Sequence, residues 1–270
     1  MAKIAEQVVV FDGSNTTDCC SATFQDVCVL PSGRILVSWR GGPQKGPINK
    51  GENGYYCMSD DGGKTWTEPK APFGTLKIGG GEGRARGFQL TSLGGNQVFG
   101  VMSLVEEIGE DLPYFNEKTE AIKNTQLYTF FSEDGGETFS EPQRIEMKGK
   151  YKGLSCVLTS PPLLLKDGRV MVNFEVYKTY YDEGSFSHHA ACIFSSDGGK
   201  TFAEPMVVYC YEAPKAEHAK SAYAEAWDEM GKYTAGHCFQ DLTNDGNLLI
   251  VNYAGPQTHK TNTMMTKVLV

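Results

Sequence analysis

Three octapeptides, SDDGGKTW at 59–66, SEDGGETF at 132–139 and SSDGGKTF at 195–202, align without gaps along this chain. Each is followed, one residue later, by Glu-Pro, and successive copies lie about 60–75 residues apart. Self-similarity at such a period is typical of folds that repeat one supersecondary unit. The octapeptide therefore governs how the rest of the sequence is interpreted.

The octapeptide has the composition of a tight turn between two strands. Its carboxylate can accept backbone N–H groups, its paired glycines can adopt a positive φ, and its Ser and Thr hydroxyls can add hydrogen bonds. The aromatic residue that ends each copy is expected to wedge between neighbouring units. A catalytic role is the alternative for the aspartates, but three copies serve three equivalent units, whereas an active site is built once. We therefore expect a structural role for Asp61, Asp134 and Asp197.

A second repeated element precedes each octapeptide and consists of an apolar strand, a glycine turn and another apolar strand. Its copies are VCVLPSGRILVSW at 27–39, FQLTSLGGNQVFGVMS at 88–103, LLLKDGRVMVNFE at 163–175 and, with no octapeptide after it, FQDLTNDGNLLIVNY at 239–253. Each complete unit then has four antiparallel strands, and such units in tandem are the blades of a β-propeller. The predicted fold class is all-β.

The pattern S-x-D-x-G-x-T followed by an aromatic residue resembles the Asp-box, the bacterial neuraminidase (BNR) repeat of the sialidase superfamily. With the preceding strands, the matches cover residues 24–253. The resemblance implies a sialidase-like propeller of six blades with its ligand site on the axis. It also implies an exo-acting glycoside hydrolase for a sialic-acid-type or other acidic sugar glycoside. Two alternatives stay open, a non-catalytic glycan-binding propeller and a truncated pseudoenzyme, because Asp-boxes occur in propellers with other functions.

The chain of 270 residues is short for six blades. We count about three and a half blades of four strands in a single domain, residues 1–270. A fourth octapeptide is expected about 28–39 residues after Gly246, beyond Val270, which favours a C-terminally incomplete domain. The alternative is a small closed ring in which KIAEQVVVF at 3–11 supplies the outer strand of the fourth blade.

Two segments interrupt the repeat. An acidic insertion spans 104–123, and a stretch rich in Ala, Glu and Lys at 213–230 is expected to form a helix. The N-terminal segment has no secretory signal pattern, and none of the eight cysteines forms a CxxC pair. We therefore expect free thiols in a reducing cytoplasm and no metal site.

Composition and charge exclude other classes of partner. With 25 Lys+Arg against 33 Asp+Glu, the net charge is −8, which argues against nucleic acid. The sequence has no run of about 18 apolar residues, so we expect no membrane-spanning helix. The expected partner is a carbohydrate ligand, with no cofactor; the oligomeric state is left open.

The resemblance implies three arginines that bind a carboxylate, a Tyr activated by a Glu, and an Asp that acts as acid and base. The chain departs from this pattern in three places, one of them the position of a later arginine, where it has Asn252 and Tyr253. Where the first arginine is expected, TFQDV has Gln25 or Asp26, and the loop 41–53 has no Asp, so Glu52 is its acid/base candidate. The remaining basic candidates for substrate binding are Arg40, Arg84 and Arg86. The alternative for Glu52, Arg84 and Arg86 is a solvated loop.

The third blade offers a base and a nucleophile in FEVYKTYYDEGSFSHH at 174–189. A phenol with a pKa near 10 needs activation, and Glu175 could activate Tyr177. The alternative is that these aromatic residues are ordinary strand-edge residues.

A third recurring motif predicts polar residues on the propeller axis. GHCFQDL at 236–242 echoes TFQDV at 23–27, and GFQL at 87–90 repeats the Phe-Gln pair. Polar side chains at equivalent inner positions would converge on the axis, or would close it by bonding to each other. The predicted lining residues are Gln25, Asp26, Gln89, His237, Gln240 and Asp241, and Asp241 is also a catalytic candidate.

Overall fold

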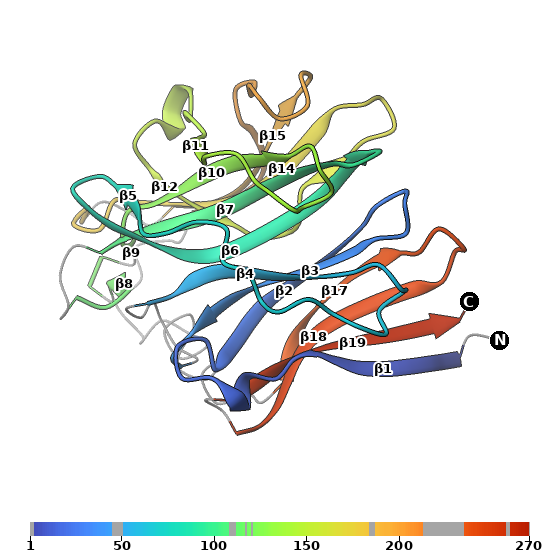
Figure 1. The fold of residues 1–270 in the computed structure, drawn as a ribbon. Coiled ribbons are helices and arrows are strands. Elements are labelled where there is room, and N and C mark those ends of the chain that lie inside the picture. The colour runs from blue at the N-terminus through green and yellow to red at the C-terminus, as the bar shows by residue number, and fades with distance from the viewer. Residues whose placement is uncertain are drawn as a thin grey trace.

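Strands make up nearly all of the regular structure. The computed structural model describes residues 3–44, 51–107, 112–116, 118–119, 121–183, 187–212, 235–257 and 260–269. The strands group into four antiparallel units, here called blades one to four, which stack one beside the next (Figure 1). In the order of contact they run four, one, two, three, from the blade that contains β1 to the blade that contains β15. No helix among the described residues is long and apolar enough to cross a membrane.

The first two blades follow the predicted order of strands. Blade one contains β2 (Ser21–Val29), β3 (Ile35–Gly42) and β4 (Asn53–Ser59), after a short 3-10 helix, η1 (Gly13–Asn15). Lys70 takes the place of its fourth strand, because Lys70 and Tyr56 exchange backbone hydrogen bonds of 2.9 and 3.0 Å. Blade two contains β6 (Gly81–Gly94), β7 (Gln97–Glu107), β10 (Thr125–Ser132) and β11 (Gln143–Arg144), with β5 (Leu76–Ile78) on the other side of β6.

The inner strand of blade three is interrupted. Both β12 (Ser155–Leu158) and β13 (Leu163–Leu164) pair with β14 (Val170–Tyr177), which is followed by β15 (Ser187–Ser195) and β16 (Met206–Glu212). A 3-10 helix, η2 (Gly149–Tyr151), precedes this blade. A small hairpin of β8 (Phe115–Asn116) and β9 (Ala121–Ile122) lies in the insertion of blade two. The insertion begins later than predicted, because β7 continues through Glu107. The helix predicted at 213–230 lies outside the described residues.

Blade four combines the two ends of the described chain. It contains β17 (Ala235–Leu242), β18 (Leu248–Gln257) and β19 (Lys260–Leu269), and its outer strand is β1 (Lys3–Phe11), antiparallel to β19. This pairing confirms the predicted outer strand at 3–11. Thr261 joins blade four to blade one, because its hydroxyl accepts from the Ala22 N–H at 3.0 Å and donates to the Ala22 carbonyl at 2.7 Å.

Three hydrophobic clusters hold the blades together. Strand residues alternate between the two faces of each blade, so each face can bury its apolar residues against a neighbour. The cluster between blades four and one contains Trp39 and Val251, that between one and two contains Leu36 and Phe88, and that between two and three contains Phe99 and Val172. The predicted stacking of blades is thus confirmed at three interfaces.

The Asp-boxes are the turns that the sequence predicts, and all three share a core set of hydrogen bonds. In the second, Asp134 Oδ1 accepts from the Thr138 N–H at 3.0 Å and from the Ser132 hydroxyl at 2.7 Å, while Oδ2 accepts from the Thr138 hydroxyl at 2.6 Å. The Thr138 hydroxyl is the main cause that lowers the pKa of Asp134 to about 2. The equivalent bonds hold Asp61 and Asp197. The predicted structural role of these aspartates is consistent with this geometry.

The aromatic residue of each Asp-box packs against the preceding blade. Trp66 lies in the cluster between blades four and one, Phe139 in that between one and two, and Phe202 in that between two and three. The predicted wedges are therefore present.

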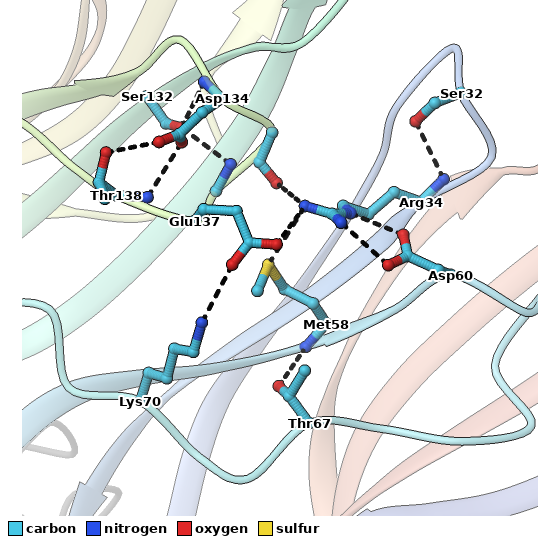
Figure 2. Close-up of polar contacts among 12 residues, drawn as sticks. Ser32, Arg34, Met58, Asp60, Thr67, Lys70, Ser132, Asp134, Glu137 and Thr138 are labelled. Atoms are coloured by element: carbon cyan, nitrogen blue, oxygen red, sulfur yellow. Dashed lines mark hydrogen bonds and ion pairs between the residues drawn. The ribbon is translucent and has the colours of Figure 1, made fainter.

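A network of ion pairs joins the Asp-boxes of blades one and two (Figure 2). Arg34, in the inner turn of blade one, binds both carboxylate oxygens of Asp60 at 2.7 and 2.9 Å. Its Nη1 also binds Glu137 Oε1 at 2.9 Å and the Gly135 carbonyl at 3.2 Å, both in the second Asp-box. Lys70 extends the network, with Nζ 3.3 Å from Glu137 Oε2.

Candidate functional site

The antiparallel order of the strands separates two ends of each blade. The start of the inner strand, the end of the second strand and the start of the third lie at one end, here called the site end. The Asp-box turns, which connect the third strand to the fourth, lie at the opposite end. Arg40 and Glu52 flank the loop between β3 and β4, Arg86 is near the start of β6, and Glu175 and Tyr177 end β14. The topology therefore brings these candidates from three blades to one end.

The buried cations of the described chain gather at the site end. They are Arg40, Arg84, Arg86, Lys123 and Lys178, each less than 9 % exposed. Burying a charge is unfavourable unless the group is paired or bound. Glu52, Glu82 and Glu107 pair with three of them. Five buried cations at one end of the blades, in a chain with a net charge of −8, make that end a candidate site for an anionic group.

A buried ion pair orients Arg40. Its Nη2 lies 3.4 Å from Glu52 Oε1, and the Glu52 side chain has no exposed surface. Burial lowers the pKa of Arg40, Glu52 opposes this shift, and the nearby charge of Arg86 adds to it. The two guanidinium groups therefore lie close enough to repel each other, and an anion between them would relieve that repulsion.

Two aromatic rings fix the guanidinium groups. The Phe24 ring centroid lies 5.4 Å from Arg40 Cζ and 5.6 Å from Arg86 Cζ, and the Tyr114 ring centroid lies 4.3 Å from Arg86 Cζ. Such contacts stabilise a cation through the negative face of the ring. No motif in the sequence marks Phe24 or Tyr114 as a site residue.

The backbone at Phe24 is strained. Its φ is +56°, the only positive value for a residue other than glycine among the described residues. The pairing of β2 with β3 shifts register between Thr23 and Asp26, and that of β6 with β7 shifts between Ala85 and Gly87, beside Arg86. Strain and bulges of this kind occur at sites where a side chain must be aimed. The sequence carries no signal for a positive φ at a phenylalanine.

The predicted base and nucleophile are in direct contact. The Tyr177 hydroxyl donates to Glu175 Oε2 at 2.7 Å, as expected for residues two apart on one face of a strand. Tyr177 is buried in a cluster with Val105 and Tyr114, and Glu175 is partly exposed. Burial raises the pKa of Tyr114, Arg86 lowers it and Glu175 raises it. Tyr114 therefore lies within electrostatic range of both the arginine cluster and the Glu175–Tyr177 pair.

The other candidates on the inner strands are buried. Arg84 donates from Nη2 to Glu82 Oε2 at 2.7 Å, and Gln25 donates to the Thr263 hydroxyl at 3.4 Å. Among the described residues, Arg84 Nε, Gln25 Oε1 and Gln89 Oε1 have no hydrogen-bond partner. A ligand or ordered water would satisfy such buried polar atoms.

Asp26 and Asp241, two acidic residues that the sequence predicts in the site, lie away from the buried cations and connect neighbouring blades instead. Asp26 Oδ2 accepts from the Leu90 N–H of blade two at 2.7 Å, and its Oδ1 accepts from the Val27 N–H at 2.8 Å. Asp241 Oδ2 accepts from the Val29 N–H of blade one at 2.8 Å. Asp241 lies one pair from the inner turn of blade four, at the end of the blade opposite the site end.

The predicted equivalence of the two Phe-Gln-Asp motifs is wrong by two residues. Asp241 is one residue before the last strand pair of its hairpin, Leu242 with Leu248, whereas Asp26 is three residues before the corresponding pair in blade one. The motif therefore occupies different registers, because the turns, rather than the motif, set the alignment of the hairpins. His237 and Gln240 lie in β17, and their side chains are outside the described set.

Metal binding has no support in the described part of the chain, where no three His, Cys, Asp or Glu side chains form a group that could hold an ion. The side chains of six cysteines are buried: Cys19, Cys20, Cys28, Cys57, Cys156 and Cys192.

Comparisons with known proteins support the fold. The family model for the BNR/Asp-box repeat matches residues 58–68. No curated protein matches the chain. Among solved structures, a Hadza microbial sialidase superposes with a TM-score of 0.63 at 14% identity, over 92% of this chain and 45% of its own. A Trypanosoma rangeli sialidase in complex with sialic acid superposes with a TM-score of 0.55 at 12% identity, over 92% of this chain and 38% of its own.

A third structure is similar over its full length. A protein of unknown function from Dyadobacter fermentans superposes with a TM-score of 0.60 at 14% identity, over 100% of this chain and 99% of its own. The chain thus spans less than half of the two sialidases and nearly all of the Dyadobacter protein. It carries an Asp-box repeat and has a sialidase-like propeller fold.

Proposed function

We propose that this protein binds an acidic sugar glycoside and hydrolyses it, as an exo-acting, sialidase-like glycoside hydrolase. The observation that carries the proposal is that buried cations lie at the same end of the blades as Tyr177, which is hydrogen-bonded to Glu175. The charges of Arg86 and Glu175 both act on Tyr114, which lies within electrostatic range of the two groups. The sialidase-like fold supports the choice of substrate class.

Arg40 and Arg86 bind the carboxylate of the sugar. A guanidinium can make two parallel hydrogen bonds to a carboxylate, and burial strengthens them because the local dielectric is low. Glu52 supports Arg40 through their ion pair, and the Phe24 ring contacts both guanidinium groups. The acid/base role expected of Glu52 stays a prediction, as does the catalytic role expected of Asp241.

Tyr177 attacks the anomeric carbon, and its phenolic proton passes to Glu175. The bond from that carbon to the leaving oxygen breaks, and the aglycone departs with the electron pair and takes a proton from water. A water molecule then attacks the anomeric carbon and the Tyr177–sugar bond breaks. Glu175 returns its proton to the Tyr177 oxygen, and the proton of the attacking water neutralises the hydroxide left by the first step. A neutral phenol spares the carboxylate of the substrate the repulsion that an anionic nucleophile would bring.

A fluorogenic aryl α-glycoside of sialic acid tests the proposal, because its aryloxide leaves without an acid catalyst. We expect turnover by the intact protein, no turnover by Tyr177→Phe, and a loss of about a hundredfold or more in kcat for Glu175→Gln. Tyr128→Phe, a half-buried tyrosine on β10, is the matched control and should keep full activity.

Binding of sialic acid by calorimetry separates the two remaining functions. If the intact protein binds sialic acid, Arg86→Met does not, and no form of the protein shows turnover, the proposed hydrolase activity is overturned. The protein would then be a glycan-binding propeller. An intact protein that neither binds sialic acid nor turns over the glycoside would overturn the whole proposal.

A further inference from the structure

The insertion of blade two contacts both Arg86 and the loop that follows Tyr177. It contains Tyr114, the hairpin of β8 and β9, and Lys123, here together called the insertion hairpin. We propose that the insertion hairpin is a positioning device: Tyr114 holds Arg86 in its binding orientation, and the loop after the Glu175–Tyr177 pair holds the hairpin. This inference rests on the proposed function of the site and adds residues to it that touch no substrate.

The first step is the contact between Tyr114 and Arg86. The Tyr114 ring centroid lies 4.3 Å from Arg86 Cζ, closer than any other ring does to a cation in the described residues. Tyr114 is 4 % exposed. Phe24 contacts the same guanidinium at 5.6 Å. Arg86 therefore lies against two rings, and its orientation depends on where the insertion hairpin places Tyr114.

The second step is how the hairpin is fixed to its own blade. The Lys123 N–H donates to the Tyr114 carbonyl at 2.9 Å, and the Glu106 N–H donates to the Asn124 carbonyl at 2.8 Å. The Thr125 side chain, at the start of β10, lowers the pKa of Tyr114 against the raising effect of burial. Lys123 Nζ lies 3.0 Å from Glu107 Oε1, so the base of the hairpin is also closed by a partly buried ion pair.

Hydrogen bonds to Tyr180 also connect the insertion hairpin to blade three. The Tyr180 carbonyl accepts two hydrogen bonds from the hairpin, from Asn116 Nδ2 at 2.9 Å and from the Thr119 hydroxyl at 2.8 Å. The Tyr180 hydroxyl in turn donates to the Pro113 carbonyl at 2.9 Å. Tyr180 is buried and lies three residues after Tyr177. Three hydrogen bonds thus connect the segment that carries Tyr114 to the loop that follows the predicted nucleophile.

The consequence is a fixed distance between the two parts of the site. Arg86 belongs to blade two and the Glu175–Tyr177 pair to blade three. The hydrogen bonds of Tyr180 connect the insertion hairpin, which contacts Arg86, to the loop that follows Tyr177. A displaced carboxylate-binding group would move the anomeric carbon away from the Tyr177 hydroxyl, and errors of about 1 Å cost large factors in rate. The insertion hairpin therefore sets both affinity and alignment.

The test compares two substitutions of Tyr114 and two of the hairpin. Tyr114→Phe keeps the ring, whereas Tyr114→Leu removes it. Asn116→Ala combined with Thr119→Val removes both donors to Tyr180. Lys118→Ala is the matched control, since Lys118 is in the same hairpin and its ion pair with Glu183 is exposed on both sides.

The first readout needs no ligand. The NMR signal of Arg86 Nε–Hε, assigned by its loss in Arg86→Lys, should be displaced by the Tyr114 ring. We expect this displacement to persist in Tyr114→Phe and Lys118→Ala, to vanish in Tyr114→Leu and to decrease in the double variant of Asn116 and Thr119. An unchanged signal in Tyr114→Leu or in the double variant would overturn the inference, whether or not the protein proves to be a hydrolase.

The second readout is kinetic, with the aryl glycoside of sialic acid as the probe. We expect Tyr114→Leu to raise KM about fivefold, because the cation–π contact is lost. Tyr114→Phe keeps the ring and should have the KM of the intact protein. The double variant should lower kcat about tenfold or more with a smaller change in KM, because it misaligns the two parts of the site. Equal losses in Tyr114→Phe and Tyr114→Leu would show a merely structural role and overturn the inference.

Discussion

At the scale of single residues, the two glycines of each Asp-box serve different purposes. Both have a positive φ, between 72° and 92° in the three copies. A Cβ on the second glycine would also collide with the preceding blade: on Gly199 it would lie 2.3 Å from the Phe99 ring, and on Gly136 2.4 Å from Leu36 Cδ2. The sequence predicted the positive φ, but the close approach depends on packing between blades that no local pattern encodes.

Gly199→Ala and Gly198→Ala separate these two effects. Their φ values are 92° and 72°, so both substitutions incur the cost of a left-handed alanine, but a Cβ on Gly198 would have only one contact, at 4.0 Å. We expect Gly199→Ala to cost about 1–3 kcal/mol more than Gly198→Ala, because the Phe99 ring must shift inside a packed core. Urea unfolding of both variants measures the difference. Equal costs would show that the backbone conformation alone requires the second glycine.

Asp26 makes a pH-dependent contribution to stability. Burial raises its pKa from 3.8 to about 8, against the lowering effect of the Leu90 and Val27 N–H groups. The folded state therefore holds a proton that the unfolded state loses near pH 4. The stabilisation is complete below pH 4 and falls as the pH rises from there to about 8.

The substitution Asp26→Asn introduces a side chain that cannot ionise, but it keeps only one of the two oxygens that accept from the Leu90 and Val27 N–H groups. We expect this variant to be less stable than the intact protein below pH 4, and the intact protein to lose this advantage progressively between pH 4 and about pH 8, because burial of the Asp26 charge destabilises it. Guanidinium unfolding at several pH values gives both curves. Curves that stay parallel over this range would contradict the raised pKa.

At the scale of elements, arginines in equivalent turns form different ion pairs. Arg34 and Arg169 both follow the glycine of an inner turn, in PSGR and KDGR. Arg169 binds Asp167 within its own turn, whereas Arg34 also reaches Glu137 in the next blade. The two sequences are too alike to reveal this difference, because the partner of Arg34 is about 100 residues away and is brought to it only by the stacking of the blades.

Arg34→Met should therefore destabilise the protein more than Arg169→Met. Asp60 and Glu137 are 67 % and 47 % exposed, so water and salt screen the network, and we expect a cost of about 1 kcal/mol for Arg34→Met. Arg169→Met should cost a few tenths. Thermal unfolding at low and at 1 M salt gives the comparison; a difference that does not shrink in salt would point to lost packing rather than lost charge.

The sequence predicted some elements well and others poorly. The turns and hairpins were predictable because glycines, Asp-boxes and apolar alternation encode them locally, and so was the outer strand at 3–11. The Glu175–Tyr177 contact was predictable too, since residues two apart share one face of a strand. Phe24 and Tyr114 were not, because a strained φ and an insertion that folds back onto Arg86 depend on long-range packing. The Phe-Gln-Asp motif misled because it ignores the register of the hairpin.

At the scale of the whole molecule, the fold depends on joining segments about 260 residues apart. Pairing of β1 with β19 completes blade four, and blade four packs on blade one through the cluster that contains Phe11, Trp39 and Val251. Closing so long a loop costs chain entropy before any contact compensates, so the joined blade is expected to form late in folding. The apolar face of β1 is then what holds the ends together.

Phe11→Ala tests that dependence. Phe11 is 6 % exposed and stacks on Trp39 with ring centroids 5.1 Å apart, whereas Ile4 on the same strand is 70 % exposed. We expect Phe11→Ala to cost about 3–5 kcal/mol and Ile4→Ala to change stability by less than about 0.5 kcal/mol. Because blades four and one share one core, tryptophan fluorescence and far-ultraviolet circular dichroism should report a single, coincident transition in both variants. Two separated transitions in Phe11→Ala, with blades two and three still folded, would show instead that blade four is an independent unit that β1 merely borders.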